Sequence, residues 1–322
     1  MNRIRTKLRG SISLLTLSAL VATGLAGAYA YIDNKADTRA QQTLAKLVDE
    51  ASEEGVALSY SDVDASPLLR SVSISDFAIK GSEQEPDLSL GDINISGFNW
   101  QDLHSENTQL PASMTITIDN GTVALKPSMV KENPDIQSVI DTFGEQINFS
   151  THFAYVLNQQ TGVLTLSTTE TVVDNFSFNS ELAFGGATWL AELDAESGEK
   201  PGTADMMSTT LNELSMTFKN DGFIEKIRSI AATKTGQSPQ QLTDESVQQL
   251  NDMKVVAEQN WGPVLVPMID ELIKFTLKPE QLHFAINPEQ GLKSNDFLMA
   301  FMGGDAGLLA LITQAQIEIK AN

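Results

Sequence analysis

Residues 72–81 read VSISDFAIKG, and the same pattern returns without gaps at residues 88–97 as LSLGDINISG. Each copy runs apolar, Ser, apolar, small, Asp, apolar, x, apolar, x, Gly. Apolar residues alternate with a period of two on either side of one extra residue, which is typical of a half-buried strand with a β-bulge. The pattern therefore predicts two strands, each with a bulge at the small–Asp pair and each ending at a glycine turn.

The apolar positions of these two copies predict one face of a sheet, which the residues after the second copy continue. Such a face either lines a trough for a lipid or another amphiphile, or packs into an ordinary core. The candidate residues of this face are Phe77, Ile79, Ile93, Ile95, Phe98 and Trp100.

The repeat has a looser relative at residues 114–125, in which Asp119-Asn120-Gly121 predicts a hairpin turn. A short helix is predicted at residues 135–146, and further strands with one apolar face fill residues 147–193. Antiparallel strands of this kind bury one face and wet the other. We expect a bent antiparallel sheet built from repeats, shaped either as a groove or as a sandwich.

The C-terminal part contains both predicted strands and predicted helices. This mixture predicts an α+β fold with a helical layer in the C-terminal third. A polar connector with Gly and Pro at residues 193–205 separates a β-rich domain, residues 56–193, from this α+β part, residues 206–322. The predicted strands are residues 211–218, 281–286 and 315–320, and the predicted helices are residues 223–232, 244–259 and 263–275.

The N-terminus predicts export. Four cations, Arg3, Arg5, Lys7 and Arg9, precede an uncharged, mostly apolar run at residues 11–32. As a helix this run is long enough to cross a hydrocarbon core of about 30 Å. We expect residues 1–32 to be either a single-pass inner-membrane anchor with a cytoplasmic N-terminus or a signal peptide cleaved after Ala30. Both alternatives place residues 33–322 in the periplasm or its equivalent.

Residues 33–55 predict a juxtamembrane helix between this run and the first strand. Leu44, Leu47 and Val48 lie on one helical face, and Gly55 supplies a C-cap. The opposite face is acidic, so we expect a stalk or packing helix and not a helix that lies on a membrane surface.

The charge of the chain excludes some classes of partner. The chain has 21 Lys and Arg against 42 Asp and Glu, and without the four N-terminal cations the formal charge is −25. Such a surface repels nucleic acid and anionic lipid headgroups, so we expect no nucleic-acid partner. The absence of cysteine excludes disulfides, thiolate nucleophiles and Cys-ligated metals.

No motif in the sequence predicts catalysis. The three histidines, His104, His152 and His283, belong to no metal-ligand spacing, and the sequence contains no nucleophile elbow, phosphate loop or dinucleotide fingerprint. We therefore expect a non-enzymatic protein with no catalytic residue, no cofactor and no metal.

One stretch carries a resemblance to known proteins. Residues 59–76, SYSDVDASPLLRSVSISD, resemble the opening of the YdgA-like and AsmA-like envelope proteins of Gram-negative bacteria, which begin with a membrane anchor and a strand pair. Residues 214–236 are similar to modules of related envelope proteins. The resemblance implies bent β-sheet grooves associated with lipid traffic or outer-membrane homeostasis, and it implies no catalytic residue.

Together these observations predict a membrane-tethered periplasmic protein that handles a lipid or another amphiphile in envelope homeostasis. Its expected partners are the inner membrane, through residues 1–32, an amphiphile, and other envelope proteins. A protein-binding module or assembly chaperone, which would use the acidic surface or a sheet edge, remains the alternative, and a cryptic hydrolase is a third.

Overall fold

The computed structural model describes residues 56–66, 70–81, 85–97, 111–131, 133–192 and 208–322, together with Gly202 and several residues between 41 and 52. The predicted membrane run at residues 1–32 and the predicted site residues Phe98 and Trp100 lie outside these ranges. Within them, no helix is both long and apolar enough to span a membrane.

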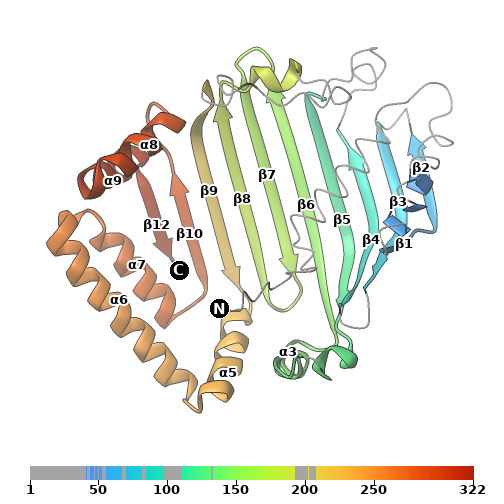
Figure 1. Cartoon of the computed structure of the whole chain (residues 1–322), viewed down its shortest axis with the longest axis horizontal. Coiled ribbons are helices and arrows are strands. Elements are labelled where there is room, and N and C mark those ends of the chain that lie inside the picture. Colours follow the sequence, from blue (N-terminus) through green and yellow to red (C-terminus); the bar gives the residue numbers. More distant parts are fainter. Residues whose placement is uncertain are drawn as a thin grey trace, which may run out of the picture.

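A single antiparallel sheet dominates the described residues, as the sequence predicted (Figure 1). Its neighbours run in the order β1-β3-β4-β5-β6-β7-β8-β9-β10-β12, while β2 pairs with β3 and β11 pairs with β9. Successive strands from β3 to β10 are antiparallel neighbours. Short turns join β3 to β4, β6 to β7 and β7 to β8, and longer connections, some with helices, join the others. The strands are β1 (Ala57–Ser59), β2 (Asp62–Ser66), β3 (Ser71–Lys80), β4 (Asp87–Ser96), β5 (Ser113–Ala124), β6 (Gln146–Asn158), β7 (Val163–Val172), β8 (Phe176–Gly185), β9 (Thr210–Asn220), β10 (Gln281–Ile286), β11 (Leu292–Lys293) and β12 (Ile317–Ala321).

The predicted bulges are present in both copies of the repeat. The register between β3 and β4 shifts after Ile74, and the left-handed residues at this level are Asp76, with φ 53°, and Gly91, with φ 56°. Residues with positive φ are typical of bulges, which increase the local twist of a sheet. Each copy is therefore a bulged strand, and the small–Asp pair marks its irregularity.

The predicted hairpin turn at residues 119–121 is wrong. Strand β5 runs through this segment without reversing, and its register with β6 shifts between Ile118 and Gly121. Asn120 has φ 59°, a left-handed conformation that occurs in tight hairpin turns and also in bulges. Here it belongs to a third bulge. Because β4 and β6 pair with β5 on both sides of this point, the chain continues as a strand.

The alternation of residue types gives the sheet one apolar face and one polar face. On the apolar face, Ile95 of β4 pairs with Ile116 of β5, which pairs with Phe153 of β6. The polar face carries a row of registered side chains that crosses nine strands. These residues are Ser73, Asn94, Thr117, His152, Thr169, Asn179, Thr217, His283 and Lys320.

The apolar face of β2 to β5 is closed into a core. Leu90 is 0% exposed and Ile93 is 1% exposed. Leu44, from the helical residues before β1, is buried in the same cluster, so this segment packs on the sheet. The buried members of the cluster are Leu44, Val63, Ala65, Ile74, Phe77, Ile79, Leu90, Ile93, Ile95, Ile116 and Phe149.

Helices occupy much of the C-terminal part, as predicted. The helix predicted from residue 244 begins earlier, because Ser238 forms a capping box with Gln241. The hairpin of α8 and α9 was not predicted. The helices are α3 (Asp135–Phe143), α5 (Phe223–Thr235), α6 (Pro239–Trp261), α7 (Val266–Leu277), α8 (Ser294–Met302) and α9 (Gly304–Ala315), with short 3-10 turns at Pro127–Lys131, Thr188–Glu192 and Gly262–Val264.

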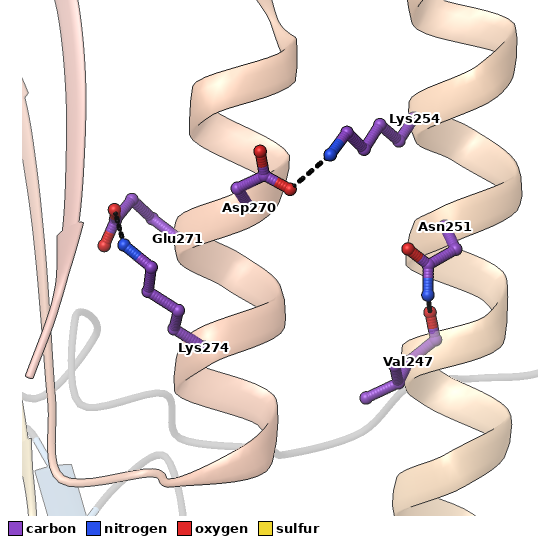
Figure 2. A network of polar contacts seen from close by, with 6 residues as sticks. All are labelled: Val247, Asn251, Lys254, Asp270, Glu271 and Lys274. Atoms are coloured by element: carbon purple, nitrogen blue, oxygen red, sulfur yellow. Dashed lines mark hydrogen bonds and ion pairs between the residues drawn. The ribbon is translucent and has the colours of Figure 1, made fainter.

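The helical layer is fixed to one end of the sheet. Lys254 of α6 reaches Asp270 of α7 with a 2.6 Å ion pair (Figure 2), and Glu271 of α7 accepts a 2.9 Å hydrogen bond from the backbone N–H of Ala321 in β12. Rings of β9 and α7 also meet, since Phe218 and Phe275 lie with centroids 6.1 Å apart. These contacts hold α7 against the β9–β12 end of the sheet.

The connector predicted at residues 193–205 falls between β8 and β9. These two strands pair from Phe176 with Asn220 to Gly185 with Thr210. The residues before and after the connector therefore belong to one sheet.

Candidate functional site

The predicted site residues that the structure describes lie in the closed core. Phe77, Ile79, Ile93 and Ile95 are each at most 5% exposed and belong to one cluster. A ligand could reach these four side chains only if the cluster opened. Their burial favours the core interpretation for this part of the apolar face, while Phe98 and Trp100 lie outside the described residues.

The apolar face continues from this core across β6, β7, β8 and β9, where most of its side chains are only half-buried, while Phe149 and Leu157 of β6 are buried. We call this surface the central face. The described helices lie at its ends in Figure 1: α3 is beside one end of β5 and β6, and α5 to α7 gather near β9 to β12. The apolar members of the central face are Phe153, Tyr155, Leu164, Leu166, Phe178, Leu182, Phe184, Leu214 and Met216.

Four polar residues on two adjacent cross-strand rungs interrupt the central face, and we call them the polar row. Thr151 of β6 pairs with Glu170 of β7, and Thr168 of β7 pairs with Ser180 of β8. All four side chains are half-buried, and none has a hydrogen-bond or ion-pair partner within the described part of the chain. Polar groups that are partly removed from water without a partner are available to bind the polar part of a ligand.

Tyr155 adds an unpartnered donor to the same face. Its hydroxyl is buried and has no hydrogen-bond partner among the described residues. Burial raises the pKa of Tyr155 above its ordinary value, so the phenol stays protonated and keeps its O–H. Its cross-strand neighbours are the apolar Met114 and Leu166. An orphaned buried hydroxyl costs about 1–3 kcal/mol, and a bound acceptor would remove that cost.

The sequence reasoning missed Tyr155 and the polar row. The signal was present, because residues 151, 168, 170 and 180 are polar at positions where the strand alternation places apolar residues. Reading each strand for breaks in its own alternation would have found them, although their alignment into one row depends on the register.

The two described histidines lie on the polar face and are bound to threonines. His152 Nδ1 is 3.3 Å from Thr117 Oγ1, and His283 Nδ1 is 2.9 Å from Thr217 Oγ1. Neither imidazole has a carboxylate partner within the described residues, and no group of three or more His, Asp or Glu in them could hold a metal ion. The histidines therefore serve as polar neighbours of threonine on the solvated side of the sheet.

Comparison with known proteins extends over the C-terminal part of the chain. A family model described as an uncharacterized protein matches residues 170–322, which include β8, β9 and all the described helices after them. No curated protein matches the chain.

Proposed function

We propose that this chain is a membrane-tethered, non-enzymatic envelope protein that binds a lipid or another amphiphile on the central face. The observation that carries the proposal is an apolar face that is closed over β2 to β5 and half-buried over β6 to β9. A half-buried apolar surface crossed by unpartnered polar groups suits a molecule that is itself part apolar and part polar.

The arrangement of the central face fits the two parts of an amphiphile. Leu166 and Leu182 pair next to Thr168 and Ser180 of the polar row, and Phe178 pairs with Glu170 of the same row. Acyl chains gain about 25 cal/mol for each Å² of apolar surface that leaves water. The polar row would then hold the headgroup or ester oxygens, and the buried hydroxyl of Tyr155 would join it once its neighbouring side chains move aside. Specificity would come from these few polar contacts and affinity from the apolar ones.

The tether is supported by the sequence. Cations at residues 3–9 followed by an apolar run at residues 11–32 favour a bilayer anchor, and the resemblance of residues 59–76 to YdgA-like and AsmA-like proteins favours the envelope. The sheet would be bent at the level of the bulges at Asp76, Gly91 and Asn120, because bulges increase twist and curvature. A bent sheet would present the central face as a groove.

The proposal can be tested by photo-crosslinking on opposite faces of one strand. The photoreactive amino acid p-benzoylphenylalanine is placed at Leu166 or at Ser167 of the full chain, expressed in a Gram-negative host grown with radioactive phosphate. Leu166 lies on the central face and Ser167 lies on the polar face of the same strand. We expect a labelled phospholipid adduct from position 166 and not from position 167.

Two outcomes would count against amphiphile binding. Equal labelling at both positions, or none at either, would remove the special role of the central face. A protein adduct at position 166 without lipid would instead favour the alternative of a protein-binding module.

A further inference from the structure

The hairpin of α8 and α9 exposes large apolar side chains at the edge of the molecule. Phe301 is 83% exposed and Met302 is 74% exposed, although both are among the residue types that folding normally buries. Figure 1 shows this hairpin beyond β10 and β12, at the edge of the sheet opposite β1 and β2. We call its exposed residues the apolar tip: Phe297, Leu298, Met299, Phe301 and Met302.

The outward direction of these side chains follows from how the two helices pack. Ala300 of α8 is 4% exposed and faces Gly307 of α9, where an added Cβ would lie 2.5 Å from the carbonyl oxygen of Ala300. Small residues thus bring the two helices close together. The large side chains of α8 have no room between the helices and point away from α9.

The charge of the hairpin indicates what could cover the apolar tip. Residues 294–316 contain Asp296 and Asp305 and no Lys or Arg. A second copy would bring another strongly acidic chain, with a formal charge of −21, to a patch whose nearest cation along the chain is Lys293, the N-cap of α8. A zwitterionic bilayer brings no net charge and accepts aromatic and aliphatic side chains at its interface.

The predicted tether makes the bilayer available to this patch. Leu44 is buried under β2 to β5, so residues 33–43 separate the predicted membrane run from the sheet. The eleven residues of this stretch can reach at most roughly 36 Å. The eight strand spacings from β3 to β12 cover roughly 38 Å at about 4.8 Å each, so both edges of the sheet lie within reach of one bilayer.

We propose that the apolar tip inserts into the headgroup region of the bilayer to which the chain is tethered. The tip would be a second contact, at the sheet edge opposite the one the tether reaches, and the two contacts would fix the orientation of the sheet on the membrane. This inference rests on the tether of the proposed function and is independent of amphiphile binding on the central face.

The absence of native cysteine allows a direct test with single labels. The full chain carrying Phe301→Cys, Ala22→Cys or Met253→Cys is labelled with the environment-sensitive dye nitrobenzoxadiazole and reconstituted in phosphatidylcholine vesicles. Met253 on α6 is 58% exposed and serves as the matched surface control. Position 22 reports on the tether. Lipids with a nitroxide near the headgroup are then added as quenchers.

The inference predicts blue-shifted emission at position 301 and about a twofold loss of it to nitroxide lipids, because an inserted side chain sits roughly 5–10 Å into the interface. Position 253 should keep the emission of a probe in water. Quenching at 22 but not at 301 would overturn insertion of the apolar tip and leave the tether intact. Quenching at 301 but not at 22 would overturn the tether alone. A blue shift at 301 that rises with protein concentration and resists lipid quenchers would assign the tip to a second copy.

Discussion

The two halves of the apolar face share one sequence pattern and differ in what covers them. Over β2 to β5 the face is closed, with Leu90 at 0% exposed and Ile93 at 1% exposed. Over β6 to β9 the equivalent positions, such as Leu166 and Leu182, are only half-buried. Alternation therefore determines which residues share a face, while the elements packed on that face determine whether it becomes a core or an accessible surface.

The covering segment of the closed half comes from the start of the chain. Leu44 belongs to the buried cluster of β2 to β5. The polar row at Thr151, Thr168, Glu170 and Ser180 has no counterpart among the buried residues of that cluster. In this account the closed half stabilises the fold and the central face is the proposed binding surface, and the following variants test this division.

The largest expected difference between the halves is in the cost of truncating a leucine. Leu90→Ala should lower the free energy of unfolding by about 2–5 kcal/mol, because it leaves a cavity in a closed core. Leu166→Ala should cost about 1–2 kcal/mol, because its side chain is only half-buried and neighbouring water can fill the space. Urea denaturation midpoints measure both losses. Equal losses would show that the two halves are packed alike.

A smaller loss of stability is expected on substitution of Asn120, which lies in a bulge of the closed half. Asn120→Val should destabilise the protein by about 1–2 kcal/mol, because a β-branched residue is strained at the observed φ of 59°. Asn120→Gly at the same site should change stability by less than about 0.5 kcal/mol, since Gly adopts this backbone freely but gains entropy in the unfolded chain. If Val were tolerated as well as Gly, the bulge would not constrain this position.

Removal of the Tyr155 hydroxyl tests whether this group takes part in binding on the central face. Tyr155→Phe is expected to stabilise the ligand-free protein by about 1 kcal/mol, because a buried O–H without a partner no longer has to leave water. The same variant should give less lipid adduct from a photoreactive residue at position 166. A variant that is destabilised and binds lipid as before would show that the hydroxyl has another partner.

The smallest expected effect is the pH dependence of one ion pair beside the closed half. The hydrogen bond from Lys126, 2.7 Å away, lowers the pKa of Asp87 below its ordinary value, and the charge of Lys126 and the backbone N–H of Gly81 act in the same direction. A carboxyl whose folded pKa is lowered contributes stability above its unfolded pKa and loses it as the pH falls through the folded pKa.

Asp87→Asn should therefore cost less than about 1 kcal/mol at neutral pH, because both side chains of the pair are partly exposed to water. The difference from the unchanged protein should begin to shrink as the pH falls to about 4 and vanish below the lowered folded pKa of Asp87. Thermal denaturation of both proteins across this range measures the difference. A difference that grows toward low pH would contradict the assignment.

Much of the fold was predictable because local patterns there agree with the tertiary structure. The small–Asp pairs of the two repeat copies, residues 75–76 and 91–92, predicted bulged strands, and the predicted strand at residues 281–286 coincides with β10. The turn predicted around Asn120 failed because one left-handed residue suits both a hairpin and a bulge, and only pairing on both sides distinguishes them.

The candidate site was less predictable because accessibility depends on distant segments. The sequence places Ile93 and Leu166 in equivalent alternating patterns, and it does not show that the helical segment containing Leu44 packs under the first and not the second. The orphaned hydroxyl of Tyr155 likewise depends on neighbours from β5 and β7. The α8–α9 hairpin had a usable signal in the apolar runs on either side of Gly303 and Gly304.

The central claim is that the apolar face is closed over β2 to β5 and accessible over β6 to β9. Single cysteines of nearly native size test it directly in this cysteine-free chain: Ala65→Cys in the closed core and Thr168→Cys on the central face. Their reaction rates with a small maleimide are compared in the native state. We predict that position 65 reacts about 100-fold more slowly than position 168, because its reaction needs an opening that costs about 3 kcal/mol. Equal rates at the two positions would contradict the division of the face into a core and a binding surface.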